Sequence, residues 1–291
     1  MPGYSRSLHW CIQALDRSPL GRLLLKDALR WDISLSDLPG QDYVIDPGRK
    51  IVLLDNHAMG PDMLWGSEFF RFDVLASLVR ALRDIAHEER YGGFDDLHNP
   101  ENILLLTRVR EADLYAVGAF VGWELRTNGM PEFWRHMIGG ADGDIAQAFA
   151  AHREKNPSQS FSHEALSNAF HQWFENTDRI NECDHEALEY LDAVLRYAKA
   201  PNPFGSKRLG GEDVELLSCM PDRTTYLYKQ GNRIARDPSF AGLDDEYNQT
   251  HFMQIMHDMQ AVHVEGVAFR DTQLASLIFP SENIRAKSAA L

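Results

Sequence analysis

The 291-residue sequence contains no apolar run long enough to span a bilayer. It has only three cysteines, Cys11, Cys183 and Cys219, and they lie far apart. An odd number of scattered cysteines predicts free thiols in a reducing cytosol rather than a disulfide framework. Residues 1–15 lack both an uninterrupted apolar core and a small-residue cleavage site, so we expect no signal peptide. These absences together predict a cytoplasmic protein without a membrane partner.

Positive charge is scarce as well. Lysine and arginine number 29 against 43 aspartate and glutamate residues, which gives a formal net charge of −14. No local basic cluster offsets this excess. Because a nucleic-acid partner requires many phosphates to be neutralised, the composition argues against one.

Familiar catalytic motifs are also missing. No two of the 12 histidines are three or four residues apart, the spacing that lets two histidines of one helix reach the same zinc ion. There is no G-x-S-x-G or S-x-x-K motif and no glycine-rich phosphate loop. Glu182 and His185 have the spacing of a di-iron carboxylate pair, but such bundles need that pair twice. We therefore predict no bound cofactor, with zinc held by residues from distant segments as the alternative.

A strongly two-sided helix is predicted over residues 67–92. Its apolar face repeats at three- and four-residue spacing and consists of Val74, Leu75, Leu78, Val79, Leu82, Ile85 and Ala86. The opposite face carries Asp73, Ser77, Arg80, Asp84, His87 and Tyr91. The apolar face must be buried, so the polar face is left for water, a partner or a cleft.

A second long helix, over residues 100–127, is apolar around most of its circumference, which predicts burial against several neighbours. Charged residues within such a helix need partners, because an unpaired buried charge is costly. We expect Glu111 or Asp113 to pair with Arg80 or Arg83 of the preceding helix.

The strands are few and lie early in the chain. Residues 31–35 alternate in polarity, and residues 43–55 contain two β-branched runs around turn residues 46–49. We expect one small antiparallel sheet with a hairpin, and helices elsewhere. The predicted fold class is therefore α+β, mainly α. Residues 1–156 form the α+β region, and residues 157–291 form a mainly helical region packed on it.

Two segments carry a resemblance to a known family. They are L-V-R-A-L-R-D-I-A-H-E at residues 78–88 and R-V-R-E-A-D-L-Y-A at residues 108–116. The chain resembles a bacterial family of zincin-type metallopeptidases of uncharacterised function over about residues 19–127. That resemblance implies a zincin-like α+β region in which the first helix carries His-Glu-x-x-His. The second helix then carries a candidate acidic third ligand.

The motif of the first helix is degenerate in this chain. Placed on the family pattern, Arg80 replaces the first histidine, Ala81 the catalytic glutamate and Asp84 the second histidine. Glu111 remains at the candidate third-ligand position. Arginine cannot ligate zinc and alanine cannot accept a proton, so the motif cannot work as written. We hypothesise that the Arg80 guanidinium takes the place of the metal ion and pairs with Asp84 and Glu111.

Three functional interpretations follow. The first is a metallopeptidase-like protein without activity that binds an unknown protein or peptide through a vestigial cleft comprising Arg80, Asp84, His87, Glu111 and Asp113. The second is a metal-dependent hydrolase with the non-standard ligands Asp84, His87 and Glu111. It draws on His87-Glu88, one turn after the degenerate motif, where Tyr91 stands in the second histidine position. The third is a helical scaffold unrelated to peptidases.

Overall fold

The structure is a computed structural model and describes residues 5–91, 97–155, 163–198 and 202–260. Within these residues the chain is mainly helical with one small sheet, as the sequence predicts. The elements in chain order are α1 (Ser5–Leu15), α2 (Pro19–Asp27), β1 (Asp32–Ser36), β2 (Tyr43–Asp46), β3 (Ile51–Asp55), α3 (Pro61–Gly66), α4 (Glu68–Tyr91), α5 (Pro100–Thr127), α6 (Pro131–Gly139), α7 (Gly143–Lys155), α8 (His163–Trp173), α9 (Thr177–Tyr197), α10 (Gly211–Leu217), α11 (Gly231–Ile234), α12 (Pro238–Ala241) and α13 (Glu246–Gln260).

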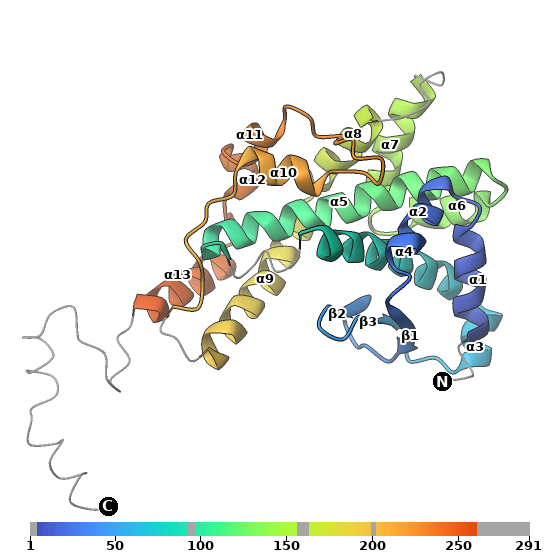
Figure 1. Cartoon of the computed structure of the whole chain (residues 1–291), viewed down its shortest axis with the longest axis horizontal. Helices are drawn as coiled ribbons and strands as arrows, with labels where there is room; N and C mark the ends of the chain where they lie inside the picture. Colours follow the sequence, from blue (N-terminus) through green and yellow to red (C-terminus); the bar gives the residue numbers. More distant parts are fainter. Residues whose placement is uncertain (1–4, 92–96, 156–162, 199–201, 261–291) are drawn as a thin grey trace, which may run out of the picture.

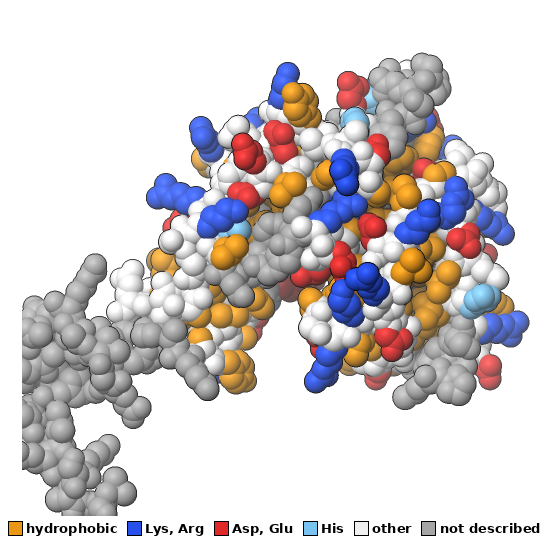
Figure 2. Space-filling model, viewed as in Figure 1, with side chains coloured by type: hydrophobic (Ala, Val, Ile, Leu, Met, Phe, Trp, Pro, Cys, Tyr) orange, Lys and Arg blue, Asp and Glu red, His pale blue; other side chains and the backbone are white. Residues whose placement is uncertain are grey.

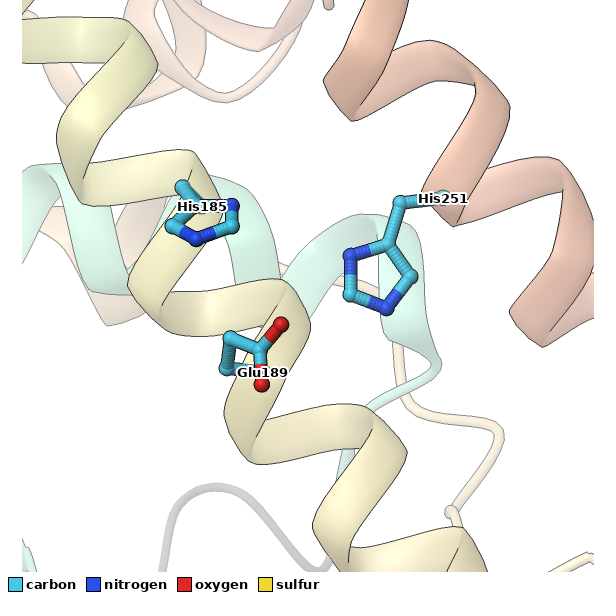
Figure 3. A group of neighbouring side chains, drawn as sticks. All are labelled: His185, Glu189 and His251. Atoms are coloured by element: carbon cyan, nitrogen blue, oxygen red, sulfur yellow. The ribbon is translucent and has the colours of Figure 1, made fainter.

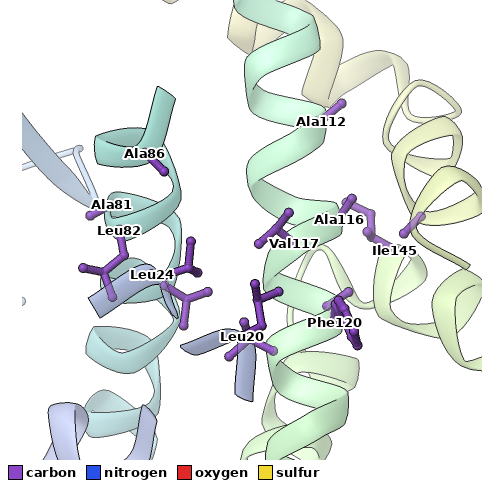
Figure 4. Close-up of a cluster of buried hydrophobic side chains, with 14 of the residues drawn as sticks. Leu20, Leu24, Ala81, Leu82, Ala86, Ala112, Ala116, Val117, Phe120 and Ile145 are labelled. Carbon is purple, nitrogen blue, oxygen red and sulfur yellow. The ribbon is translucent and has the colours of Figure 1, made fainter. Parts of the chain in front are cut away.

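Helices α4 and α5 lie side by side at the centre of the molecule (Figure 1). All seven residues of the predicted apolar face of α4 are buried, so that prediction is confirmed. Figure 4 shows Leu82 of α4 and Val117 of α5 in one cluster with Leu20 and Leu24 of α2. Burying a leucine or valine side chain of this kind stabilises the fold by about 1.5–3 kcal/mol. This cluster fixes which face of α4 is left for the polar residues.

Helix α5 is buried on most sides, because α4, α6, α7, α8 and α9 all pack against it. Its start is set by Asn99, whose side chain accepts a hydrogen bond from the Asn102 amide at 3.0 Å, with Pro100 in the first turn. A Cβ added at Gly122 would collide with the Met137 sulfur, so glycine there lets α6 approach closely. The charged residues of α5 are therefore held at fixed positions.

The sheet has the strand order β1-β3-β2 and is mixed. β2 and β3 form the predicted antiparallel hairpin. β1 instead pairs with β3 in parallel, with Ile33 opposite Val52, so the prediction of an all-antiparallel sheet is wrong for this strand. β1 and β2 do run in opposite directions, but β3 enters between them. Val52 and Leu54 of β3 are buried, and β2 and β3 pack against α4.

The segments after residue 180 are attached to α5 through Arg108. Its buried guanidinium donates two hydrogen bonds of 2.6 Å to the Asp184 carboxylate on α9. It also donates to the backbone carbonyls of Phe240 at 2.5 Å and Gly242 at 2.9 Å. One side chain thus links α5 to α9 and to the segment around α12. None of the helices in the described residues combines the length and hydropathy of a bilayer-crossing segment.

Candidate functional site

A cleft of about 970 Å³ lies between β2 with the loop before it, α4, α5 and α9. We call it the acidic cleft. Figure 2 shows a hollow between the part of the molecule that contains α9 and the part that contains the sheet, with acidic side chains at its depth. Its charged lining residues are Asp42, Arg80, Asp84, Glu88, Arg110, Glu111, Arg179, Glu182, His185, Glu186 and Glu189. Arg80 and Asp84 of the polar face of α4 therefore border a cleft rather than open water.

Arg80 lies in the acidic cleft, as do Asp84 and Glu111, but its ion pair differs from the prediction. Its guanidinium pairs with Asp42, in the loop before β2, and lies over the Tyr115 ring at 5.0 Å from the centroid. The predicted ion pair of Arg80 with Asp84 is wrong, because Asp84 pairs with Arg110 instead. Asp42 can reach Arg80 because β2 packs against α4, a contact for which the sequence gives no signal.

Arg110 of α5 forms ion pairs with two carboxylates of α4. Its Nη2 lies 2.6 Å from Asp84 Oδ1 and 2.9 Å from Glu88 Oε1, and all three side chains are largely buried. Guanidinium–carboxylate hydrogen bonds of this length are among the stronger ones in proteins. Two carboxylates of α4 are therefore already paired with a side-chain cation.

His87 and Asp113 are not in the cleft lining; they are fully buried between α4 and α5. Asp113 accepts hydrogen bonds from Arg83 at 2.5 and 3.0 Å and from the Tyr226 hydroxyl at 2.7 Å, and His87 Nε2 lies 3.0 Å from its carboxylate. The Arg83–Asp113 pair is one of those predicted. Burial acts to raise the Asp113 pKa, but Arg83 and His87 outweigh it and hold the pKa well below its ordinary value.

Glu111 differs from its neighbours, because it makes no hydrogen bond or ion pair within the described part of the chain. Burial, reinforced by the negative charge of Asp84, raises its pKa from 4.5 to about 7. Cys183 also lines the cleft, and burial raises the pKa of its thiol well above the ordinary value. A thiol held in this way is a poor nucleophile.

The five predicted site residues thus divide into two sets. Arg80, Asp84 and Glu111 meet in the cleft, whereas His87 and Asp113 belong to the buried network behind it. In the second interpretation Asp84, His87 and Glu111 would share a metal ion. However, Asp84 is already paired with Arg110, and His87 is already in contact with Asp113. The Tyr91 side chain lies outside the described residues.

Another group does have the composition of a metal site. His185 and Glu189 of α9 and His251 of α13 each offer a ligand atom within 4.8 Å of the other two (Figure 3). It is the one such group of histidine, cysteine and acidic residues among the residues that the structure describes. The spacing of His185 and Glu189 is visible in the sequence, as His-Glu-x-x-Glu at residues 185–189. His251 carries no sequence signal, because only the packing of α13 on α9 brings it there.

Comparison with known protein families identifies the class to which this mainly helical protein belongs. Residues 73–228 match the family model described as "Putative metallopeptidase family (DUF6782)". The match spans more than half of the chain, so this protein is a member of that family. Membership of this family favours the two metallopeptidase interpretations over that of a scaffold unrelated to peptidases. Searches of curated proteins and of solved structures find no match.

The contacts of Arg80 predict a modest effect for Arg80→Ala. Its partner Asp42 has a 53% exposed side chain, and exposed ion pairs contribute little. With the loss of the Tyr115 contact added, we expect the free energy of unfolding to fall by about 1 kcal/mol in urea denaturation. A loss above about 3 kcal/mol would instead indicate a buried cluster of Arg80 with Asp84 and Glu111.

Proposed function

We propose that this family member has no peptidase activity at the α4–α5 motif and that its acidic cleft binds a basic segment of a protein or peptide. The observation that carries the proposal is that side-chain ion pairs occupy the segment in which the family resemblance places the metal ligands. Arg80 and Arg110 supply positive charge at the motif, and their partners are Asp42, Asp84 and Glu88. A carboxylate already neutralised by a guanidinium is a poor ligand for a metal ion.

The charge balance of the cleft supports a cationic ligand. Arg179, the third arginine of the lining, is held by Asp142 and Asp144 at 2.9 Å each. Four carboxylates of the lining have no ion pair within the described residues: Glu111, Glu182, Glu186 and Glu189. The cleft therefore presents uncompensated negative charge, which attracts lysine and arginine side chains.

Two of these carboxylates have pKa values that a cation would lower. Burial raises the Glu111 pKa to about 7, and burial together with Glu182 raises the Glu186 pKa. Perturbed carboxylates in a cleft are typical of functional sites. Tyr43, Tyr115 and Tyr190 also line the cleft, and aromatic rings favour contact with lysine and arginine. A basic peptide would thus find both charge and ring faces.

The test is a fluorescence-anisotropy titration with a labelled lysine–glycine peptide, and with a glutamate–glycine peptide of the same length. We expect the basic peptide alone to bind, more weakly at high salt because screening reduces the attraction. Glu111→Gln should weaken binding about 10-fold, equivalent to about 1.4 kcal/mol. Affinity should rise from pH 6 to pH 8 as Glu111 ionises, and this rise should be absent in Glu111→Gln.

A matched control lies on the same helix. Glu101 is an exposed carboxylate of the first turn of α5, outside the cleft, so Glu101→Gln should leave peptide binding unchanged. The proposal would be contradicted if the acidic peptide bound as tightly as the basic one. It would also be contradicted if Glu101→Gln weakened binding of the basic peptide as much as Glu111→Gln does.

The absence of peptidase activity needs its own assay. We expect no cleavage of casein or of a fluorogenic peptide library, with or without added Zn²⁺. Zinc-dependent cleavage that is lost in Glu111→Gln and in Asp84→Ala would overturn this part of the proposal. It would favour the hydrolase with Asp84, His87 and Glu111 as ligands.

A further inference from the structure

We propose that His185, Glu189 and His251 form a binding site for a divalent first-row metal ion, with zinc as the ion they match best. Two imidazoles and one carboxylate are a ligand set that zinc takes in proteins. The site is separate from the degenerate motif on α4 and does not depend on the peptide-binding proposal. His185 and Glu189 line the acidic cleft, and His251 approaches from α13 (Figure 3).

The convergence of the three side chains follows from helix geometry and packing. His185 and Glu189 are four residues apart on α9 and therefore point the same way. One turn earlier on α13, the Asn248 side chain donates to the Asn181 carbonyl of α9 at 2.9 Å. One turn later, Ile255 is buried in a cluster with Leu188. His251 lies between these two contacts, so its position opposite α9 is fixed on both sides.

The ligand atoms are available for an ion. Within the described residues none of the three side chains makes a hydrogen bond or ion pair, unlike Asp84 and His87 at the α4–α5 motif. Ligands that are each about 2 Å from a zinc ion are at most about 4 Å apart. Because the three atoms already lie within 4.8 Å of one another, small side-chain rotations suffice to close the site.

Bound metal would cross-link α13 to α9. Three protein ligands would leave the fourth position of a tetrahedral zinc ion for water. The ion would stabilise the folded chain by mass action, because the three ligands come together only when α13 is docked. Zinc should therefore raise the melting temperature as its concentration increases.

The test uses the full chain, treated with a chelator and then titrated with Zn²⁺ by calorimetry and with Co²⁺ by visible absorption. We expect one equivalent of each ion to bind, with d–d bands for Co²⁺. His185→Ala and His251→Ala should each weaken Zn²⁺ binding about 100-fold, equivalent to about 2.7 kcal/mol. His257→Ala is the matched control, since His257 is an exposed histidine of the same helix outside the group, and it should bind as the native chain does.

A substitution that should retain the site makes the test sharper. Glu189→His would complete a His-Glu-x-x-His helix and should bind Zn²⁺ at least as tightly as the native chain. The proposal is overturned if no stoichiometric binding occurs, or if affinity is unchanged in both His185→Ala and His251→Ala. Peptide binding in the anisotropy assay has a separate readout, so either proposal can fail without the other.

Discussion

Asp113→Ala should lower the free energy of unfolding by about 3–5 kcal/mol, the usual cost of removing one partner of a buried ion pair. The Asp113 side chain is 1% exposed, as is that of Arg83, whose guanidinium it holds with two hydrogen bonds. Without the carboxylate the Arg83 charge stays buried, and the carbonyls of Leu217 and Cys219, to which it also donates, are neutral. The Tyr226 hydroxyl loses its acceptor as well.

Urea denaturation measures this loss of unfolding free energy, and two further variants serve as controls. Asp192→Ala breaks an exposed pair with Arg196 and should change the unfolding free energy by less than about 0.5 kcal/mol. The double variant Arg83→Met with Asp113→Leu removes both charges and should recover much of the loss. A cost below about 1 kcal/mol for Asp113→Ala would mean that water reaches the Arg83 guanidinium.

Glu111→Gln should instead stabilise the protein, by about 3 kcal/mol at pH 8. Its folded-state pKa of about 7 lies above the unfolded value near 4.5, so the folded state binds the proton more tightly. Each pKa unit is worth 1.36 kcal/mol, and the stability cost of the ionised carboxylate grows as the pH rises from about 4.5 to 7. Below pH 4 both states are protonated and the cost disappears.

The measurement is the unfolding free energy of both proteins between pH 4 and pH 8. The advantage of Glu111→Gln should be near zero at pH 4, increase towards pH 7 and then level off. Glu101→Gln should stay within about 0.5 kcal/mol of the native chain throughout. An advantage independent of pH would show that Glu111 does not titrate in this range. If Glu111 lowers stability and also strengthens peptide binding, it shows the trade-off between stability and function that is expected of a functional residue.

Periodicity predicted the helices well, because burial selects residues at helical spacing. All seven apolar residues of α4 are in the core. Two of the charged residues of α5, Asp113 and Arg110, have partners in Arg83 and Asp84 of α4, whereas Glu111 makes no ion pair within the described residues. The pattern could not give strand direction. Alternation in β1 defines which side chains share a face, but β1 lies beside β3, and that neighbour depends on how the whole chain is routed.

The candidate site was predictable only where local spacing determines it. Arg80, Asp84 and Glu111 do border one cleft, since they project from adjacent helices. The partner of Arg80 is a loop residue, Asp42, and no spacing rule connects the two. The His185–Glu189 pair could have been read from the sequence, because mixed histidine–carboxylate pairs four apart reach one ion as two histidines do. His251 lies 62 residues beyond Glu189, so only the structure could place it beside that pair.

The two buried arginines of the central helices limit how the chain can be divided. Arg83 draws on carbonyls at residues 217 and 219, and Arg108 on those at residues 240 and 242 as well as on Asp184. A fragment ending near residue 156 would retain both guanidinium groups without these acceptors. Such a truncated product should therefore misfold or aggregate when expressed alone, and deletions meant to isolate the motif-bearing half would report on lost acceptors rather than on function.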